Sequence, residues 1–384
     1  MMIMKKKLLM LVGLFCLFFF VFLRIAFYCS SDIHAHALFA TLSMENGHMF
    51  SGNFLLYSLL NVVSGFSSDV EKVIVADCFL LAMAVVLKYI IVYRYFTNYY
   101  CAFLSGLLSF SLLFVYIIPL VMPAEYYLGY RPLRFYLNYY VPNVWHNSTI
   151  IFSMPFAILT YMYSLKLLTH FSMKDCLKVS LVSVICVMIK PSFFFAFSCP
   201  YTLLVLWKYY HEKQKLLALL VPVFLCIVGV VYQYMTIYDT SDGSSVIFSL
   251  NRMFSVDYWK LRWPYYISSF VFPAIYPILN YRKCIHDVEF ILVYSMLMIS
   301  ILIWLLFEET GLRAGHGNLG WQIIPSMWFV YFYIVRRELT VIADFSFNYL
   351  SIPIRHKLVI GSYLLMVVTG IIYLAKYLYF GHYV

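Results

Sequence analysis

Apolar runs long enough to cross a lipid bilayer recur along this chain from one end to the other. Residues 8–27 and 290–307 are two of these runs, and neither alternates apolar with polar residues as a membrane β-barrel strand does. A helix needs about 20 apolar residues to cross the hydrocarbon core. Because a bilayer offers no water to exposed backbone groups, we expect the spans to be helices.

The composition indicates that lipid is the solvent for most of the chain. Of the 384 residues, 64% are hydrophobic and 11% are charged, and the mean hydropathy is +0.85. Soluble domains average about half apolar and about a quarter charged residues, and they need a polar surface. The sequence therefore predicts an all-α fold: a polytopic integral membrane protein with a single transmembrane domain over residues 1–384.

Hydropathy places eleven spans along the chain. The fifth and sixth are short and meet at Lys190-Pro191-Ser192, where proline removes a backbone donor. Two short helices that meet at the outer face are favoured there over one long broken helix. The predicted spans are residues 8–27, 73–93, 101–120, 150–168, 178–189, 193–207, 216–235, 265–279, 290–307, 321–335 and 358–380.

The charged residues support this topology. The side that holds Lys5, Lys6 and Lys7 carries 17 of the 27 Lys and Arg residues but six of the 17 acids, so the two sides differ as +11 against −1. An excess of cations is typical of the cytoplasmic side. We therefore expect a cytoplasmic N-terminus and a first span that is retained, since no small-x-small cleavage site follows it. The extracytoplasmic loops, which we expect to form the site, are then approximately 30–69, 122–148, 236–264 and 308–320.

Several classes of chemistry are not supported by the sequence. The basic residues behind the net charge of +10 recur at the ends of apolar runs and form no single patch, so no nucleic-acid partner is expected. The nine cysteines form no CxxC or Cys/His pattern, which leaves no zinc site or disulfide framework. Neither GxxxxGK[ST] nor a GxGxxG opening a helix occurs. We expect no metal and no cofactor, and a substrate that the membrane presents.

The first candidate site follows the first span directly. Asp32 lies where the chain leaves the membrane, and an acid there is well placed to deprotonate an acceptor hydroxyl that attacks a lipid-linked donor. Alternatively, Ser31 or Asp32 caps a helix over residues 33–44. Asp32 and His34 are the candidate catalytic residues, and His36 is a candidate substrate-binding residue.

The second outer loop offers phosphate-binding and sugar-binding side chains. Arg131 and Arg134 could clamp a phosphate or pyrophosphate, because guanidinium groups bind phosphate bidentately. Trp145 could stack on a sugar ring, although Trp and Tyr are enriched at every membrane interface. The sequence Asn147-Ser148-Thr149 has the form of a glycosylation sequon, but it lies too close to a span to be used as one. The substrate-binding candidates in this loop are Arg131, Arg134, Trp145, His146 and Asn147.

Further polar candidates lie at two other outer positions. Lys190 is a cation with apolar residues on both sides, and such charges are costly and tend to be functional, unless the side chain extends to the outer headgroups. The loop 308–320 combines glycines, which allow tight turns near a ligand, with a cation, an acid/base group and an amide. These substrate-binding candidates are Lys190, Arg313, His316 and Asn318.

The layout of the whole chain resembles that of the GT-C class of polytopic glycosyltransferases. The resemblance lies in the first span entering from the cytoplasm, in Asp32 near His34 and His36, and in Gly47 followed by the apolar stretch 53–65. GT-C enzymes use polyprenyl-phosphate sugars, with an acid of the first outer loop as base. Members often carry two acids there, whereas here Glu45 is the only other acid near Asp32.

Segments 145–147 and 317–318 look like those of membrane proteins from bacterial surface-polysaccharide clusters. Together these resemblances imply extracytoplasmic transfer of a sugar from a polyprenyl-linked donor, in the inner (plasma) membrane, during O-antigen or capsule assembly. The implied partners are a polyprenyl-phosphate-linked or polyprenyl-diphosphate-linked saccharide, membrane lipid and other polysaccharide-assembly proteins.

Two alternatives remain open. A flippase for lipid-linked glycans, or another transporter, would line its core with charges at mid-membrane depth, and apart from Asp77 and Lys190 the spans are poor in them. The second alternative is an O-antigen polymerase of the Wzy type, which joins undecaprenyl-diphosphate-linked repeat units. Such polymerases are similar to this chain in length, aromatic content and number of spans. Such polymerases use arginines of large outer loops, a role that would suit Arg131, Arg134, Arg252, Arg262 and Arg313.

Overall fold

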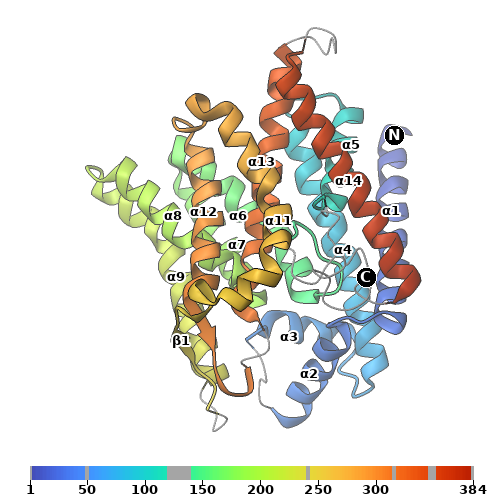
Figure 1. Ribbon diagram of the computed structural model, residues 1–384. Coiled ribbons are helices and arrows are strands. Elements are labelled where there is room, and N and C mark those ends of the chain that lie inside the picture. Colours follow the sequence, from blue (N-terminus) through green and yellow to red (C-terminus); the bar gives the residue numbers. More distant parts are fainter. Residues whose placement is uncertain are drawn as a thin grey trace. The chain divides into compact units, whose positions relative to one another are not determined.

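The computed structural model is helical nearly throughout, which confirms the all-α prediction (Figure 1). It describes residues 2–47, 52–118, 140–238, 243–313, 317–344 and 352–381. The only strands among these residues are β1 (Val246–Phe248) and β2 (Phe307–Glu309), an antiparallel pair. The helices are α1 (Met2–Tyr28), α2 (Ile33–Asn46), α3 (Phe54–Val63), α4 (Val70–Phe96), α5 (Ala102–Phe114), α6 (Ser148–Thr169), α7 (Met173–Ile189), α8 (Ser192–Tyr209), α9 (Lys213–Tyr238), α10 (Asn251–Phe254), α11 (Val256–Cys284), α12 (Val288–Leu306), α13 (Ile323–Asp344) and α14 (Ile354–Phe380), with 3₁₀ turns η2 (Gly311–Arg313) and η3 (Asn318–Gly320).

Six helices of the described part of the chain are long and apolar enough to cross a bilayer: α1, α4, α6, α9, α12 and α14. They mark the chain as an α-helical membrane protein. Each of the other five predicted spans also corresponds to a helix, namely α5, α7, α8, α11 and α13.

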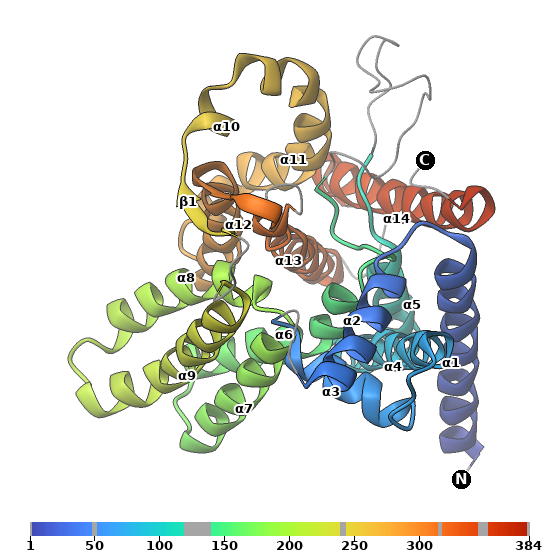
Figure 2. The same ribbon diagram turned by 90° about the horizontal axis from the view of Figure 1, so that it is seen from below.

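The chain forms two compact units. Unit 1 comprises residues 1–110, 144–245 and 378–382, and unit 2 comprises residues 111–143, 246–377 and 383–384. In unit 1, α4 packs between α1 and α6, and α7 packs between α6 and α9 (Figure 2). In unit 2, α13 packs on α11 and α12.

Helices α2 and α3 pack on each other and on α4. Gly47 ends α2 with a left-handed backbone (φ 63°), a conformation that glycine adopts without steric cost. A hydrogen bond of 3.0 Å joins His36 Nδ1 to the Tyr57 hydroxyl, and Asn61 Nδ2 donates to the Ala40 carbonyl at 3.2 Å. These contacts hold α2 against α3.

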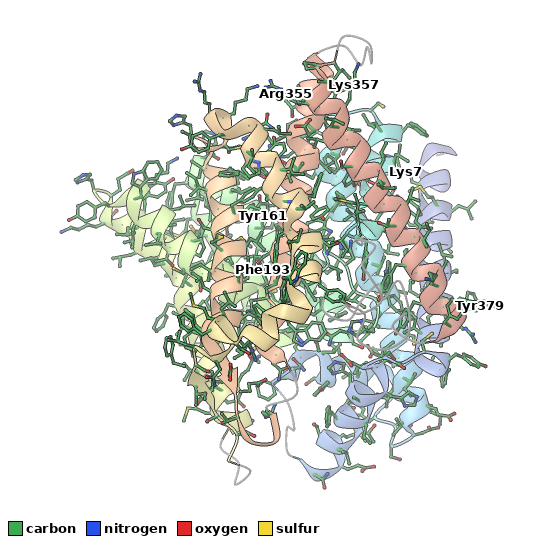
Figure 3. All side chains as sticks on the ribbon, in the orientation of Figure 1. Lys7, Tyr161, Phe193, Arg355, Lys357 and Tyr379 are labelled. Carbon is green, nitrogen blue, oxygen red and sulfur yellow. The ribbon has the colours of Figure 1, made fainter. Side chains whose placement is uncertain are left out.

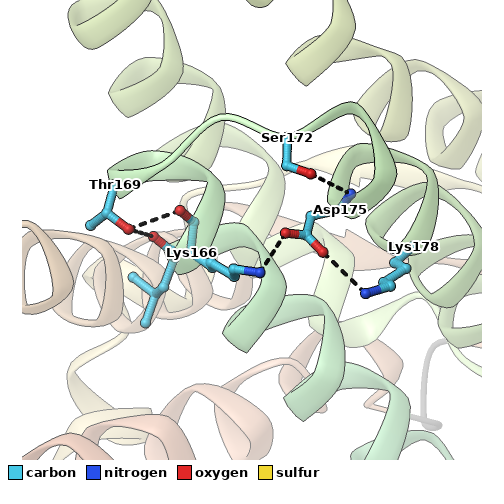
Figure 4. Close-up of polar contacts among 6 residues, drawn as sticks. Lys166, Thr169, Ser172, Asp175 and Lys178 are labelled. Carbon is cyan, nitrogen blue, oxygen red and sulfur yellow. Dashed lines mark hydrogen bonds and ion pairs between the residues drawn. The ribbon is translucent and has the colours of Figure 1, made fainter.

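An acid and two lysines join α6 to α7 (Figure 4). The Asp175 carboxylate lies 2.7 Å from Lys166 Nζ on α6 and 3.1 Å from Lys178 Nζ on α7. Ser172 caps α7 by accepting the Asp175 backbone N–H. These interactions lie at the end of the two helices that the charge pattern assigns to the cytoplasm.

The prediction of two helices around Lys190 is confirmed. α7 ends at Ile189 and α8 begins at Ser192, with Lys190 extended and Pro191 at the N-cap position. Both helices are longer than the predicted spans, at 17 and 18 residues. The turn places Lys190 beside the first turn of α6, where its Nζ donates to Thr149.

Charged and aromatic residues are found at opposite ends of α14 (Figure 3). Arg355 and Lys357 lie at its beginning, and the exposed Tyr379 lies at its other end.

Near the beginning of α1, Lys7 Nζ lies 5.8 Å over the ring of Tyr93, which is close to the end of α4. The start of α1 and the end of α4 therefore lie together, as antiparallel spans require.

The third predicted span needs a correction. Residues 101–120 were expected to form one helix, but α5 ends at Phe114, and residues 115–118 are not helical although residues 115–117 are buried. Asn143 Nδ2 donates to the carbonyls of Leu112 (3.2 Å) and Val115 (2.8 Å), and Thr369 Oγ1 donates to that of Ile117 (2.9 Å). Side chains of the protein thus satisfy the carbonyls that the end of the helix leaves free.

The irregular segment also requires a glycine on α14. A Cβ added at Gly370 would overlap the Phe114 carbonyl oxygen and lie 3.2 Å from Cβ of Tyr116. The Tyr116 N–H donates to the Met366 carbonyl at 3.2 Å, and the rings of Tyr116 and Tyr373 stack with centroids 4.5 Å apart. Only glycine allows α14 to approach the segment this closely.

Replacing Gly370 with alanine is therefore expected to destabilise the protein. Overpacking of this kind typically costs about 1–3 kcal/mol, so Gly370→Ala should lower the thermal midpoint of the detergent-purified protein. The control is Gly361→Ala on the same helix, where an added Cβ meets nothing within 4 Å. Alanine forms helices better than glycine, so the control should be neutral or stabilising. Equal midpoints for the two variants would contradict this account of Gly370.

Candidate functional site

Asp32 lies at the start of α2 and is held by the segment that leads into α6. Its backbone N–H donates to the His146 carbonyl at 2.9 Å, and its Oδ2 accepts from Asn147 Nδ2 at 2.6 Å. The Asp32 side chain makes no capping hydrogen bond to α2, although Asp32 occupies the N-cap position. The helix that the capping alternative required is therefore present, but its first turn does not use this carboxylate.

Asn147 is the N-cap of α6. Its Oδ1 accepts the backbone N–H of Ile150 at 3.0 Å and the hydroxyl of Thr149 at 2.8 Å. Asparagine is among the best N-cap residues because its side-chain oxygen satisfies a free backbone donor of the first turn. The same amide thus begins a helix and binds the Asp32 carboxylate.

The side chains of Lys190 and Asp77 also form hydrogen bonds with residues of the first turn of α6. Lys190 Nζ donates to Thr149 Oγ1 at 2.9 Å, and Ser148 Oγ donates to Asp77 Oδ2 at 2.6 Å. Asp77 lies on α4 and is fully buried, and its Oδ1 has no hydrogen-bond partner among the described residues. We call these side chains, together with the two histidines near them, the Asn147 cluster: Asp32, His36, Asp77, His146, Asn147, Ser148, Thr149 and Lys190.

Both histidines of the cluster are buried and neutral at pH 7. Burial lowers the pKa of His36 to about 4, with a further lowering by Lys190 and an opposing effect of Asp32. Burial also lowers the pKa of His146 to about 4, where Asp32 opposes the shift and Lys190 adds to it. His36 Nε2 is buried without a hydrogen-bond partner among the described residues. His36 therefore presents an unused polar atom in this part of unit 1.

His34 does not join the cluster. It is exposed on α2, whereas His36 is buried. Successive residues of a helix are about 100° apart, so side chains two positions apart point to different faces. The structure thus brings together Asp32 and His36 from the first outer loop, but not His34.

Trp145 packs inside unit 1. Its ring stacks on Phe18 with centroids 5.6 Å apart and an interplanar angle of 8°, and Phe22 lies at 6.2 Å. The side chain is 4% exposed. Because α1 covers the ring, Trp145 holds α1 against the start of α6, and its stacked face is not open to a sugar.

The candidates of the last outer loop lie in unit 2. Asn318 Nδ2 donates to both oxygens of the buried Glu309, at 3.1 and 3.0 Å, and Arg313 ends the turn η2. Arg252 lies 3.9 Å from Glu308 and donates to the Trp304 carbonyl at 2.7 Å. These contacts organise the loop around β2. Arg131, Arg134 and His316 lie outside the described residues.

Asp77, Ser148 and Thr149 were not among the predicted site residues. One signal was present for Asp77, because a lone acid in an apolar run is costly and is usually retained for a reason. Ser148 and Thr149 gave only the sequon pattern, and both are fully buried. Among the described residues, no group of three or more His, Cys, Asp or Glu side chains could hold a metal ion.

The fold and the cluster define the class of protein: an α-helical membrane protein with a buried polar cluster around the start of one span. Comparison of the sequence with protein-family models and with curated proteins finds no match.

The two buried histidines predict that acid destabilises the protein. Their pKa is about 4 in the folded state and about 6.5 in an unfolded chain. Between these values the unfolded state binds more protons, so the free energy of unfolding falls as the pH is lowered from about 6.5 to about 4. The slope is at most about 1.4 kcal/mol per pH unit for each histidine.

Thermal midpoints measured between pH 7.5 and pH 4.5 in detergent test this expectation. His36→Gln should make the pH dependence shallower, because one of the two groups no longer titrates. His34→Gln is the matched control on the same helix, since its side chain is exposed in the folded state. Identical profiles for wild type and His36→Gln would show that His36 is not held neutral by burial.

Proposed function

We propose that this protein is a membrane glycosyltransferase that moves a sugar from a polyprenyl-linked donor to an acceptor outside the cytoplasm, during surface-polysaccharide assembly. The observation that supports the proposal is the set of contacts made by the Asp32 carboxylate. Its carboxylate lies at the end of the first span, is held by the neutral amide of Asn147, and forms no ion pair with Lys or Arg among the described residues.

The acids assigned to the cytoplasmic side behave differently. Among those whose side chains are described, Asp175, Glu212, Asp287 and Glu289 form ion pairs with Lys or Arg, and Glu338 is hydrogen-bonded to His356. A nearby cation stabilises the charged form of a carboxylate and so weakens its affinity for a proton. A general base has to accept a proton during the reaction. Asp32, which accepts from a neutral donor, suits that role better than the acids paired with Lys or Arg: Asp175, Glu212, Asp287 and Glu289.

In the proposed reaction, Asp32 performs a single proton transfer. Its carboxylate takes the proton of the acceptor hydroxyl while the hydroxyl oxygen bonds to the anomeric carbon of the donor sugar. The bond from that carbon to the lipid phosphate breaks, and the phosphate oxygen leaves with the electron pair. General base catalysis of this kind is worth about 10²–10⁴-fold in rate.

We further propose that the chain crosses the inner membrane eleven times, with a cytoplasmic N-terminus. The helices α1, α4–α9 and α11–α14 supply the spans, and the cationic ends of α1 and α14 face the cytoplasm. The Asn147 cluster then lies towards the outer face, where a polyprenyl-linked sugar would be presented.

Reporter fusions test this topology. A reporter active only in the cytoplasm should give a signal when fused after Glu212 or after Asp344, because both positions follow a helix that runs inwards. Fusions after Ser245 and after Asn318 should be silent, and a reporter active only outside should give the opposite pattern. A cytoplasmic signal from the Asn318 fusion would contradict the proposed orientation of α12 and α13.

The glycan made by a deletion strain tests the activity. Loss of one sugar from a surface glycan, restored by the wild-type gene but not by Asp32→Asn, is the expected result. Asparagine keeps the size of aspartate but loses its affinity for a proton, so turnover should fall about 10²–10⁴-fold at an unchanged protein level. Full restoration by Asp32→Asn would exclude Asp32 as the base.

Arginine variants separate this proposal from polymerase activity. Arg131→Lys and Arg313→Lys keep a positive charge but lose the bidentate geometry, so in a transferase they should weaken donor binding more than turnover. A polymerase would accumulate single unpolymerised repeat units in the deletion strain, depend on these arginines and tolerate Asp32→Asn. Repeat units trapped inside the cell would indicate a flippase, and an unchanged set of surface glycans would exclude all three activities.

A further inference from the structure

We propose that Thr149 and Lys190 are positioning residues that act on Asp32 through the side-chain amide of Asn147. The inference rests on the proposed role of Asp32 as the base. It follows from a chain of three hydrogen bonds that runs from a cation to the candidate base: Lys190 to Thr149 (2.9 Å), Thr149 to Asn147 (2.8 Å) and Asn147 to Asp32 (2.6 Å).

The direction of this chain is determined by the chemistry of its members. A lysine ammonium can only donate, so Thr149 Oγ1 must accept from Lys190. The single hydroxyl hydrogen of Thr149 is then left to donate to Asn147 Oδ1. A threonine hydroxyl without Lys190 could instead rotate and turn its lone pairs towards Asn147.

The orientation of the Asn147 amide follows in turn. Its oxygen faces two donors, the Thr149 hydroxyl and the Ile150 N–H. A flipped amide would turn its NH₂ group towards both donors and its oxygen towards the Asp32 carboxylate, which is unfavourable on both sides. Thr149 thus supplies one of the two hydrogen bonds that keep the amide N–H pointed at Asp32.

Burial strengthens the central hydrogen bond of this hydrogen-bond chain. Thr149 is 0% exposed and Asn147 is 4% exposed, so solvent does not compete for the hydrogen bond between them, whereas Asp32 and Lys190 are half-buried. In such surroundings hydrogen bonds are strong and polarise one another along a chain. Lys190 therefore holds the Thr149 hydroxyl, and through it the Asn147 amide, in one orientation. Asp32 Oδ2 stays on this donor, which leaves Oδ1 to meet the acceptor hydroxyl.

The hydrogen-bond chain also connects three separate parts of unit 1. Asp32 begins α2, Asn147 and Thr149 begin α6, and Lys190 lies in the turn between α7 and α8. A catalytic carboxylate must be held closely, since a displacement of about 1 Å can cost about 10²-fold in rate. The positioning roles of Thr149 and Lys190 are thus distinct from contact with the substrate.

Isosteric variants at Thr149 test the proposal. Thr149→Val keeps the shape but removes the hydroxyl, and should lower the rate of sugar incorporation in the complemented deletion strain about 10- to 100-fold. Thr149→Ser keeps the hydroxyl and should recover the rate to within a few-fold. Thr160→Val is the matched control, because Thr160 is equally buried on α6 and its hydroxyl has no partner among the described residues.

A second pair of variants breaks the chain from its other end. Lys190→Met removes the donor to Thr149, whereas Lys190→Gln retains an N–H donor without the charge. Lys190→Gln should be the faster of the two if the hydrogen bond to Thr149 matters. This pair leaves α6 unaltered, so it tests the chain even if Thr149→Val fails to accumulate.

Binding separates positioning from substrate contact. Affinity of the purified variants for undecaprenyl phosphate should be unchanged in Thr149→Val, because only the geometry of the base is altered. A wild-type rate for Thr149→Val beside an inactive Asp32→Asn protein overturns the positioning role and leaves the proposed function standing. Equal impairment of Thr149→Ser and Thr149→Val also overturns it. A wild-type rate for Asp32→Asn overturns the proposed function and the positioning role together.

Discussion

Hydrocarbon offers no hydrogen bonds, so each backbone and charged group inside a bilayer needs a partner from the protein itself. Helices meet this requirement by themselves, which is why they make up nearly all of the described chain. After α5 the backbone leaves the helix, and side chains from distant segments take over its hydrogen bonds. Asn143 and Thr369 serve the freed carbonyls, and Gly370 lets α14 come close enough to do so.

The same requirement gives Asn147 two tasks. As the N-cap of α6 it satisfies a backbone donor of the first turn, a contribution typically of about 1 kcal/mol. Its NH₂ group is then free to bind the Asp32 carboxylate. One residue thus couples the start of a span to the candidate base, and the stability of the helix and the geometry of the site depend on the same amide.

Much of the fold could be predicted from the sequence, because hydropathy is a property of each segment alone. All eleven predicted spans correspond to helices, and Pro191 was enough to predict the break between α7 and α8. The end of α5 at Phe114 could not be predicted from residues 101–120. It depends on partners such as Asn143 and Gly370, which are distant in sequence.

The site was predictable in its parts but not in its assembly. Asp32, His36 and Lys190 were each recognised as candidates from their own segments, and only the fold shows that they lie around Asn147. His34 shares its pattern with His36 but occupies another face of α2. Trp145 was a candidate for stacking on a sugar ring, yet its own ring is covered by Phe18. Periodicity cannot tell which neighbour covers a side chain.

The start of α6 explains how two acids can be held there without ion pairs to Lys or Arg among the described residues. Asn147 binds Asp32, and the adjacent Ser148 binds Asp77, so both carboxylates lie at the N-terminal end of a 22-residue helix. A helix N-terminus carries the equivalent of about half a positive charge. This is less than the full charge that Lys or Arg provides to acids such as Asp175. The helix end therefore places a partial positive charge beside both carboxylates, and the side chains of Asn147 and Ser148 hold them in place by hydrogen bonds.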